Sequence, residues 1–521
     1  MANILLQRNK AGIVLAGYLF IIVSAISGKA RELHGTMSPT IDEPPLFALT
    51  VPAGGINHYM ATNKREYSKQ ADILPENEIR KTAPETSMEW QVGISSRVIT
   101  PDSNVWLAGY GEKRIPEGKL HDIWAKVLAL KSKNNERAVM VTTDNQGMSR
   151  TIYEDLYKKI HERFGLERSE FMLTFSHNHS GPRLRGDLVD YYPSDDQQRR
   201  LVDEYSDWME AQIIDAIDEA LKNWQPALLS KGKGFCGFAV NRRDNVELDV
   251  PALLAEGKPL KGVVDHDVPV LAVRNHNGNL LAVLFGYACH PTTLRGTLWS
   301  GDYPGFAQVS LEKRFPGVTA MFFNACGGDQ NPIPRRTVAL CQQYGDMLSN
   351  AVQEVLNKPM QPISSTLRTT FRFISLDYDE VVTAEKLLPI TTDSYEIHAR
   401  WARRMLEMID KDVTFPTSYH YYPVEAWQIG KELLLIGTGG ESVVDYSLRF
   451  KHEYGQESTW VCGYANIMVA YIPSRRVWEE GGYEGGSHLD EYGHPAWRWA
   501  GTIEDRIAKA VHHLVKRVRK H

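Results

Sequence analysis

Short apolar runs alternate along the chain with longer segments in which apolar residues recur every three or four positions. The runs typical of buried strands are 137–143, 171–175, 269–274, 279–288, 318–323 and 432–436. The segments with the helical period are 152–165, 195–221, 338–356, 383–410 and 502–518. Because strands and helices interleave, the pattern predicts an α/β fold of mixed β-sheets flanked by helices in a single large domain.

The N-terminal part of the chain lacks this pattern. Arg8 and Lys10 precede an uncharged, mostly apolar run of about sixteen residues, and Ala25-Ile-Ser27 offers a small-x-small cleavage site. This layout is typical of a secretory signal, and the run is shorter than the roughly twenty residues of a membrane-spanning helix. An uncleaved anchor is the alternative. The predicted organisation is a signal peptide over 1–27, an extended leader over 28–88 and the large domain over 89–521.

The predicted signal implies export to the periplasm, the medium or the cell surface.

The composition, with 43% apolar and 24% charged residues, is ordinary for a globular protein. A formal net charge of -5 gives no reason to expect nucleic acid as a partner. The five cysteines form no CxxC pair, so a cysteine-based zinc site is not expected, and their odd number leaves at least one outside any internal disulfide.

Unusual polar residues stand where several predicted strands end. His177 and His179 follow the run 171–175, and residues two apart in extended backbone face the same way. His290 closes the strand at 279–288, and Glu441 follows three glycines within four residues, which suggests a tight turn that leaves room. Reactive groups of α/β proteins gather at such strand ends, so these side chains are candidates for one site.

Each candidate also has an ordinary interpretation. The paired histidines suit a loop in which they bond to backbone or water, and His290 suits a buried core position. Glu441 suits a helix N-terminus, where the macrodipole favours an acid, and Tyr471 suits a half-buried strand. Taken together, however, these residues supply nitrogen and oxygen ligands. Two histidines and a carboxylate around zinc form a known hydrolytic arrangement, and a nearby cation favours the phenolate of a tyrosine.

A series of short motifs follows a characteristic order along the chain. They are Val92-Gly to Ile99-Thr-Pro101, Leu107-Ala-Gly-Tyr-Gly111, His121-Asp122, Ser176-His-Asn-His-Ser-Gly-Pro182, Asn241-Arg242, His290-Pro291, Ser300-Gly-Asp-Tyr-Pro-Gly-Phe306, Gly328-Asp329 with Asn331-Pro332, Gly440-Glu441 and Tyr471-Ile472. In this order, over roughly residues 90 to 515, the chain resembles the catalytic domain of the neutral/alkaline (non-lysosomal) ceramidases.

The resemblance implies a zinc-dependent amidase that cleaves the N-acyl bond of ceramide into a sphingoid base and a fatty acid. Carried over residue by residue, the implied zinc ligands are His177, His290, Glu441 and Tyr471. A metal-bound water would then attack the amide carbonyl, with zinc as the Lewis acid.

Three further residues receive roles from the same resemblance. His179 would lie beside the metal and pass a proton to the leaving amine. Arg242 would bind the developing oxyanion, and its alternative is a surface arginine paired with Asp244. Asp302 would orient a ligand histidine without touching the metal, and its alternative is a turn-stabilising role.

The chain departs from the family pattern in two places. The family's Gly-Asp-Val-Ser-Pro-Asn is Gly328-Asp-Gln-Asn-Pro-Ile333 here, so Asn331 stands at the serine position and cannot act as a nucleophile. A zinc-water mechanism survives this change, but the change bears on ceramide as the substrate. We also expect the family's C-terminal β-sandwich domain to be missing, so membrane docking or substrate access would differ.

The sequence therefore predicts an exported zinc-dependent amidohydrolase that acts on a ceramide-like N-acyl substrate. Its partner would be a small-molecule or lipid substrate, reached in the lipid case at a membrane surface. The alternatives are a zinc hydrolase of the same fold for a non-lipid amide or ester, such as an N-acyl sugar, and a metal-binding relative without catalysis. A ceramidase needs an apolar channel to the zinc, whereas a sugar-amide enzyme needs a polar, aromatic-lined cleft.

Overall fold

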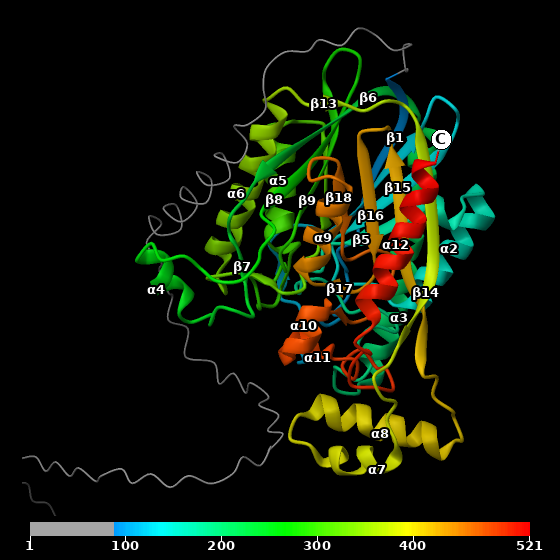
Figure 1. Ribbon diagram of the computed structural model, residues 1–521, viewed down its shortest axis with the longest axis vertical. Coiled ribbons are helices and arrows are strands. Elements are labelled where there is room, and N and C mark those ends of the chain that lie inside the picture. The colour runs from blue at the N-terminus through cyan, green and yellow to red at the C-terminus, as the bar shows by residue number, and fades with distance from the viewer. Residues whose placement is uncertain (1–87, 521) are drawn as a thin grey trace, which may run out of the picture. The chain divides into compact units, whose positions relative to one another are not determined.

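The computed structural model describes residues 88–520, in which strands and helices interleave from end to end (Figure 1). The predicted signal peptide and the predicted leader up to residue 87 lie outside the described residues. Within residues 88–520, no helix is both long enough and apolar enough to cross a membrane.

The larger of two main sheets has nine strands. Its order is β11-β9-β8-β6-β1-β3-β4-β5, with β13 beside β6. The strands are β1 (Glu89–Val98), β3 (Trp124–Lys131), β4 (Arg137–Thr143), β5 (Phe171–Phe175), β6 (Gln225–Phe235), β8 (Asp267–Arg274), β9 (Leu280–Tyr287), β11 (Thr319–Asn324) and β13 (Gln361–Pro362). The β4–β5 and β9–β11 pairs are parallel and the others antiparallel, so the sheet is mixed, as predicted.

A second sheet has the order β14-β15-β16-β18. Its strands are β14 (Leu367–Asp377), β15 (Ser418–Ile429), β16 (Leu433–Thr438) and β18 (Thr459–Cys462). Three short ribbons complete the β-structure. They pair β2 (Gly118–Lys119) with β10 (Leu298–Trp299), β7 (Ala239–Asn241) with β12 (Gln330–Pro332), and β17 (Glu441–Ser442) with β19 (Tyr471–Ile472).

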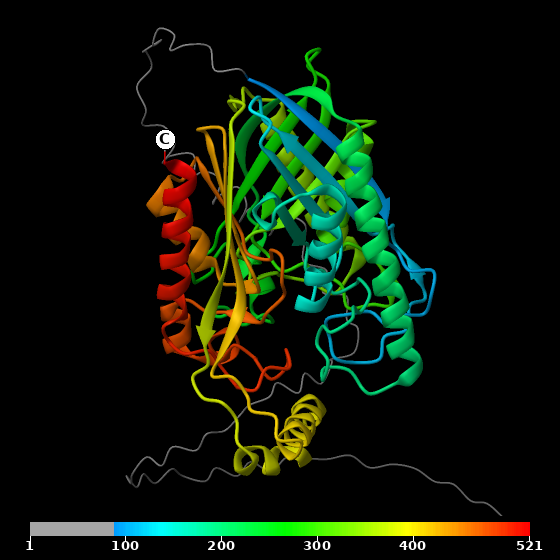
Figure 2. The same ribbon diagram turned by 90° about the vertical axis from the view of Figure 1, so that its right-hand side faces the viewer.

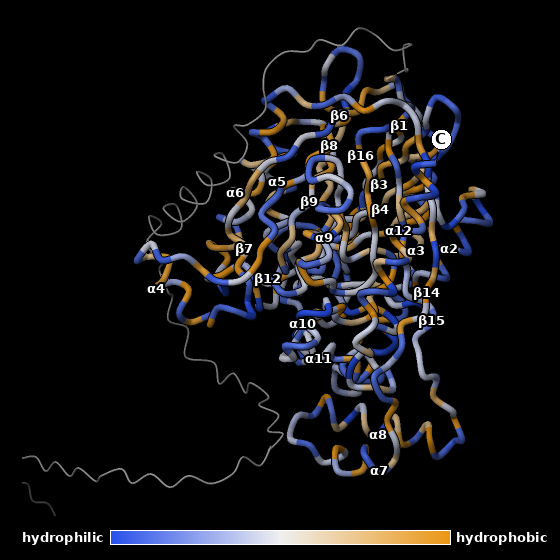
Figure 3. The backbone as a smooth tube through the Cα atoms, viewed as in Figure 1, coloured by the Kyte–Doolittle hydropathy of each residue, from blue (hydrophilic) through white to orange (hydrophobic). Residues whose placement is uncertain are grey.

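The two sheets pack face to face between helices. Leu128 and Met140 on the large sheet share a buried cluster with Trp427 and Leu435 on the second sheet. The alternate residues, such as Val127, point to the opposite face, where α2 (Arg150–Phe164) and α3 (Asp196–Lys222) pack. The terminal helix α12 (Ile503–Arg519) covers the outer face of the second sheet (Figure 2). Strands that are buried on both faces, such as β5 and β16, are mostly apolar (Figure 3).

The remaining helices lie at the edges and ends of the sheets. Helices α5 (Asp302–Arg314) and α6 (Val338–Leu356) pack on β8, β9 and β11. The connection between β14 and β15 holds α7 (Ala384–Leu387), the 3-10 turn η2 (Leu388–Thr392) and α8 (Glu396–Asp410), which share a small apolar cluster. The other short elements are η1 (Arg168–Glu170), α4 (Val250–Ala255), α9 (Val444–Tyr454), α10 (Arg475–Glu480) and α11 (Gly482–Gly486).

Most predicted elements are confirmed with small shifts at their ends. The predicted helix at 152–165 is α2, which begins where the Ser149 hydroxyl accepts from the Ile152 amide and ends at Gly165 with φ +60°. The predicted helical segment 383–410 is interrupted, because Pro389 cannot continue the helix. Helix α5 was not predicted, since Pro304 and Gly305 in its first turn break the apolar pattern. The five cysteines are all buried and free.

Candidate metal centre

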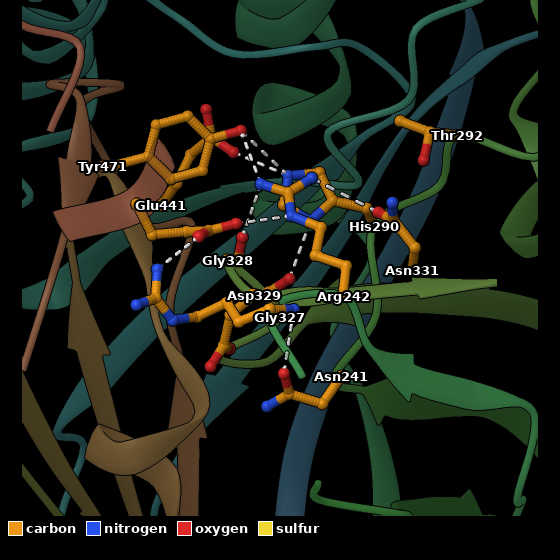
Figure 4. Close-up of polar contacts among 12 residues, drawn as sticks. Asn241, Arg242, His290, Thr292, Gly327, Gly328, Asp329, Asn331, Glu441 and Tyr471 are labelled. Carbon is orange, nitrogen blue, oxygen red and sulfur yellow. Dashed lines mark hydrogen bonds and ion pairs between the residues drawn. The ribbon is translucent and has the colours of Figure 1, made fainter. Parts of the chain in front are cut away.

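The four residues implied as zinc ligands come from strand ends and meet at one place. His177 lies two residues after β5, and His290 lies three residues after β9. Glu441 and Tyr471 are opposite each other in the parallel β17–β19 ribbon. Figure 4 shows Glu441, His290 and Tyr471 converging. All four side chains are buried, with at most 5% of each residue exposed.

The distances are those of a compact ligand group. His177, His290 and Glu441 each offer a ligand atom, and these atoms lie within 4.8 Å of one another. The Oε2 atom of Glu441 is 2.7 Å from His290 Nε2 and 3.1 Å from His177 Nε2. The Tyr471 hydroxyl is 3.4 Å from His290 Nε2. The group therefore offers two nitrogens and two oxygens to a single cation.

Hydrogen bonds to the backbone define which histidine nitrogens can bind a metal. His177 Nδ1 lies 2.6 Å from the Gln146 carbonyl oxygen, and His290 Nδ1 lies 2.7 Å from the Gly327 carbonyl oxygen. A carbonyl only accepts, so each Nδ1 carries the proton and each Nε2 of a neutral ring carries a lone pair. Burial lowers the pKa of His290 to about 4, which keeps that ring neutral. Two lone pairs then face one carboxylate oxygen, and a divalent cation satisfies all three.

The backbone around two of these residues is unusual. His177 has φ +64°, a left-handed conformation that costs a residue with a side chain about 1–3 kcal/mol. Gly440, next to Glu441, has φ +73°, and a Cβ there would lie 2.5 Å from the Ala470 carbonyl oxygen. The tight turn expected from the glycines before Glu441 is therefore present, and it lets β17 approach the chain leading into β19.

Tyr492 is a site residue that the sequence did not reveal. Its hydroxyl donates to Oε1 of Glu441, the carboxylate oxygen that does not face the histidines. Both oxygens of Glu441 are therefore in use, one toward the histidines and one toward Tyr492. No motif around Tyr492 predicts this contact, because it joins residues 51 positions apart in the sequence.

His179 lies directly beside the ligand group. Its Nε2 is 3.4 Å from His177 Nε2, and its ring packs edge-on to the Tyr110 ring at 4.8 Å between centroids. Burial, followed by the neighbouring His177 and His290, lowers the pKa of His179 well below its usual value. Gly109 makes room for this ring, since a Cβ there would lie 2.3 Å from His179 Cγ. His179 is therefore a neutral imidazole at the edge of the site, and its role as a proton carrier stays a prediction.

Arg242 also reaches the ligand group. Its Nη2 donates to the Tyr471 hydroxyl at 3.2 Å and to the Gly328 carbonyl at 2.9 Å (Figure 4). Its Nε pairs with Glu484 at 2.6 Å rather than with Asp244. Asn331, at the family's serine position, accepts from Arg242 Nη1 at 3.3 Å. Arg242 is thus an oriented, charge-balanced donor beside Tyr471.

Asp302 occupies a different environment. Its carboxylate accepts from the Leu294 amide at 2.9 Å and from the Tyr303 amide at 2.7 Å, and its backbone has φ +53°. Among residues 88–520, no histidine bonds to it. These contacts fit the turn-stabilising alternative and give no support to the orientation of a ligand histidine.

The sequence matches the family model of the neutral/alkaline non-lysosomal ceramidase N-terminal domain over residues 90–362. Neutral ceramidase B of Dictyostelium discoideum is 26% identical over 266 residues, which are 47% of this chain and 36% of that protein. The chain therefore aligns with little more than a third of the length of this curated relative.

Two solved structures share the fold. Neutral ceramidase from Pseudomonas aeruginosa superposes with a TM-score of 0.63 at 18% identity, covering 82% of this chain and 74% of that one. A ceramidase complexed with C2 superposes with a TM-score of 0.64 at 17% identity, covering 83% of this chain and 76% of that one. The family match spans more than half of the chain, and this protein belongs to the neutral/alkaline non-lysosomal ceramidase family.

Proposed function

We propose that this protein is a zinc-dependent amidohydrolase that cleaves the N-acyl bond of a ceramide-like substrate. One observation carries the proposal: His177, His290 and Glu441 converge within 4.8 Å in a chain of the ceramidase family. The adjacent His179 and Arg242 supply the other groups that amide hydrolysis requires.

The donor set suits zinc. Neutral imidazole nitrogens with one carboxylate form the ligand pattern of hydrolytic zinc sites, and Tyr471 adds a fourth donor. Burial, followed by the nearby Glu441, holds the pKa of Tyr471 well above its usual range, so its phenolate requires a compensating cation. When bound, the metal would polarise the amide carbonyl and lower the pKa of water to about 7.

The chain's own groups would manage charge and protons around that centre. Arg242 is held by Glu484 and already donates toward the Tyr471 hydroxyl, so it is placed to donate to the negative charge that develops on a carbonyl oxygen. His179 stays neutral beside His177, so it can take up a proton and deliver it to the leaving nitrogen. The proposal includes export, which is motivated by the signal pattern of residues 1–27.

The metal part is tested by comparing the zinc content of purified wild type and His290→Ala. The matched control is His513→Ala, which removes an exposed histidine of α12. We expect stoichiometric zinc in the wild type and the control, and its loss in His290→Ala. Unchanged zinc in a folded His290→Ala protein would reject the ligand assignment.

The amidase part is tested separately with the zinc-loaded protein. It is incubated with a panel of N-acyl lipids, N-acyl sugars and simple esters, and the released amine, acid or alcohol is measured. Release of an amine from an N-acyl lipid is the expected result. Release from N-acyl sugars or esters alone would move the assignment to the alternative zinc hydrolase. A zinc-containing protein that cleaves nothing would support the metal-binding relative without catalysis.

A further inference from the structure

Three arginines surround the ring of Tyr110 next to the candidate metal centre. The guanidinium carbons of Arg114, Arg295 and Arg336 lie 4.6, 5.2 and 5.7 Å from the centroid of that ring. The Tyr110 ring in turn packs against the His179 ring. Arg114, Arg295 and Arg336 are called the arginine cluster below.

The cluster adjoins the metal centre from two directions. Arg114 donates to the His179 carbonyl at 2.8 Å. Arg336 Nη1 donates to the Tyr110 hydroxyl at 3.2 Å and to the carbonyl of Thr292, two residues after His290, at 3.3 Å. A substrate with its amide at the ligand group can therefore place a second polar group near Arg336.

The arginines around the site differ in charge balance, and Arg295 of the cluster pairs with Glu112 at 3.2 Å. Arg242 pairs with the buried Glu484, and Arg335 forms a two-pronged pair with Glu247 at 2.6 and 2.7 Å. Neither Arg114 nor Arg336 forms an ion pair with any of the residues 88–520. Glu247 feels the charge of Arg336 and Glu112 that of Arg114, but neither carboxylate contacts these guanidinium groups directly.

Arg114 has a structural explanation, and Arg336 does not. Arg114 is buried and donates to the carbonyls of Ala108, His179 and Gly296, so it holds the loops together. Arg336 is half-buried and makes both of its hydrogen bonds through Nη1. Its Nε and Nη2 bond to nothing in the described chain, which leaves one edge of the planar fork for a carboxylate, phosphate or sulfate.

The backbone of Arg336 gives an independent indication. Its φ is +91°, a conformation that residues with a side chain rarely adopt, and its amide donates to the Thr293 carbonyl at 2.7 Å. Such strained residues cluster at ligand-binding sites, because function retains them against their cost. Arg336 also follows closely on residues 328–333, where this chain departs from the family motif.

We propose that Arg336, together with Arg295, binds an oxyanion group of the substrate. The preferred substrate is then an anionic N-acyl compound, such as one carrying a carboxylate or a phosphate beside the amide, rather than neutral ceramide. This substrate class rests on the proposed amidase function. Tyr110 is the positioning residue, since its ring and hydroxyl hold Arg336 next to His179.

Pairs of substrates that differ only in charge test the proposal. Dodecanoyl-glycine is compared with dodecanoyl-glycinamide, and dodecanoyl-phosphoethanolamine with dodecanoyl-ethanolamine. The zinc-loaded wild type should show a kcat/KM about ten- to a hundredfold higher for the anionic member of at least one pair, as expected for one charge-assisted hydrogen-bond pair. The preferred pair identifies the oxyanion. Equal kcat/KM values within both pairs would overturn the proposal.

Arg336→Gly is the sharpest variant, because it removes the guanidinium and also relieves the backbone at φ +91°. Its melting temperature should be no lower than that of the wild type, while the anionic-to-neutral ratio should fall about ten- to a hundredfold. Arg336→Lys keeps the charge but not the fork, so its ratio should be intermediate. Arg368→Ala, at an exposed position of β14, is the control and should keep the wild-type ratio. An unchanged ratio in Arg336→Gly would contradict the proposal.

A binding measurement separates this inference from the proposed function. Calorimetry with dodecanoyl-glycine and dodecanoyl-glycinamide reports oxyanion recognition even if the protein hydrolyses neither compound. Tighter binding of the acid by the wild type, lost in Arg336→Gly, would support the arginine cluster even if the amidase assignment failed. Hydrolysis with no difference in binding would leave the amidase assignment standing and reject the cluster.

Discussion

The candidate metal centre and the arginine cluster lie side by side but are built in opposite ways. The ligand group is buried, its histidines are held by backbone carbonyls, and its carboxylate has a partner on each oxygen. The arginine cluster comes from loops, and Arg336 retains unused donors and a strained backbone. Because the ligand group is paired within the protein, we infer that it performs the same chemistry on every substrate. Because Arg336 keeps unused donors, we infer that it selects substrates that carry an oxyanion.

The largest expected effect concerns the ligand group itself. Glu441→Ala removes the oxygen that faces both histidines, so zinc should be lost and hydrolysis should fall to background for anionic and neutral substrates alike. Zinc content and kcat/KM for both members of each substrate pair measure this. Loss of activity toward only one member of a pair would show that the ligand group also selects the substrate, a role assigned here to the arginine cluster.

Arg242 should affect the turnover rate rather than the preference for anionic over neutral substrates. Arg242→Gln removes the donor that we propose for the reacting carbonyl, so kcat should fall about a hundredfold with little change in KM. Arg243→Gln is a matched control, because Arg243 shares Glu484 but makes no contact with Tyr471. A comparable fall in kcat in both variants would indicate a structural role for the pair.

Tyr492 should act through the metal. Tyr492→Phe keeps the ring but removes the hydroxyl that holds Glu441, so zinc affinity should fall about ten- to a hundredfold. Competition with a chelator measures the affinity without reference to turnover. Tyr205→Phe removes a buried hydroxyl that donates to the Ile99 carbonyl, and it should leave zinc affinity unchanged. Equal affinities in the wild type and Tyr492→Phe would show that Glu441 needs no such support.

The smallest effect concerns stability alone. Asp329 is fully buried, and burial raises its pKa to about 7. Its folded-state pKa lies above the unfolded value, so its contribution to stability is present below about pH 4 and is lost as the pH rises through 7. Asp329→Asn should therefore melt about 1–3 °C higher than the wild type at pH 8, with a smaller gain at pH 5. A gain that grows as the pH falls would have the wrong sign.

The features of the site that could be predicted from the sequence are those that depend on neighbouring residues in the chain. His177 stands where an apolar run stops, and the glycines before Glu441 mark a turn, so local pattern made both positions candidates for the site. The family resemblance added Arg242 and the choice of four ligands. Tyr492 and Glu484 were missed, because their contacts join segments far apart in the sequence that only the tertiary fold brings together. The strained backbone of Arg336 could not be predicted either, since neither composition nor hydrophobic periodicity depends on the φ angle of one residue.

Diffraction from crystals of the zinc-loaded protein at wavelengths on either side of the zinc absorption edge tests the central claim most directly. The account predicts one strong anomalous peak, present only above the edge, within bonding distance of His177 Nε2, His290 Nε2, Glu441 and the Tyr471 hydroxyl. Well-ordered crystals with no peak among these four side chains, or with the zinc bound elsewhere, would contradict it.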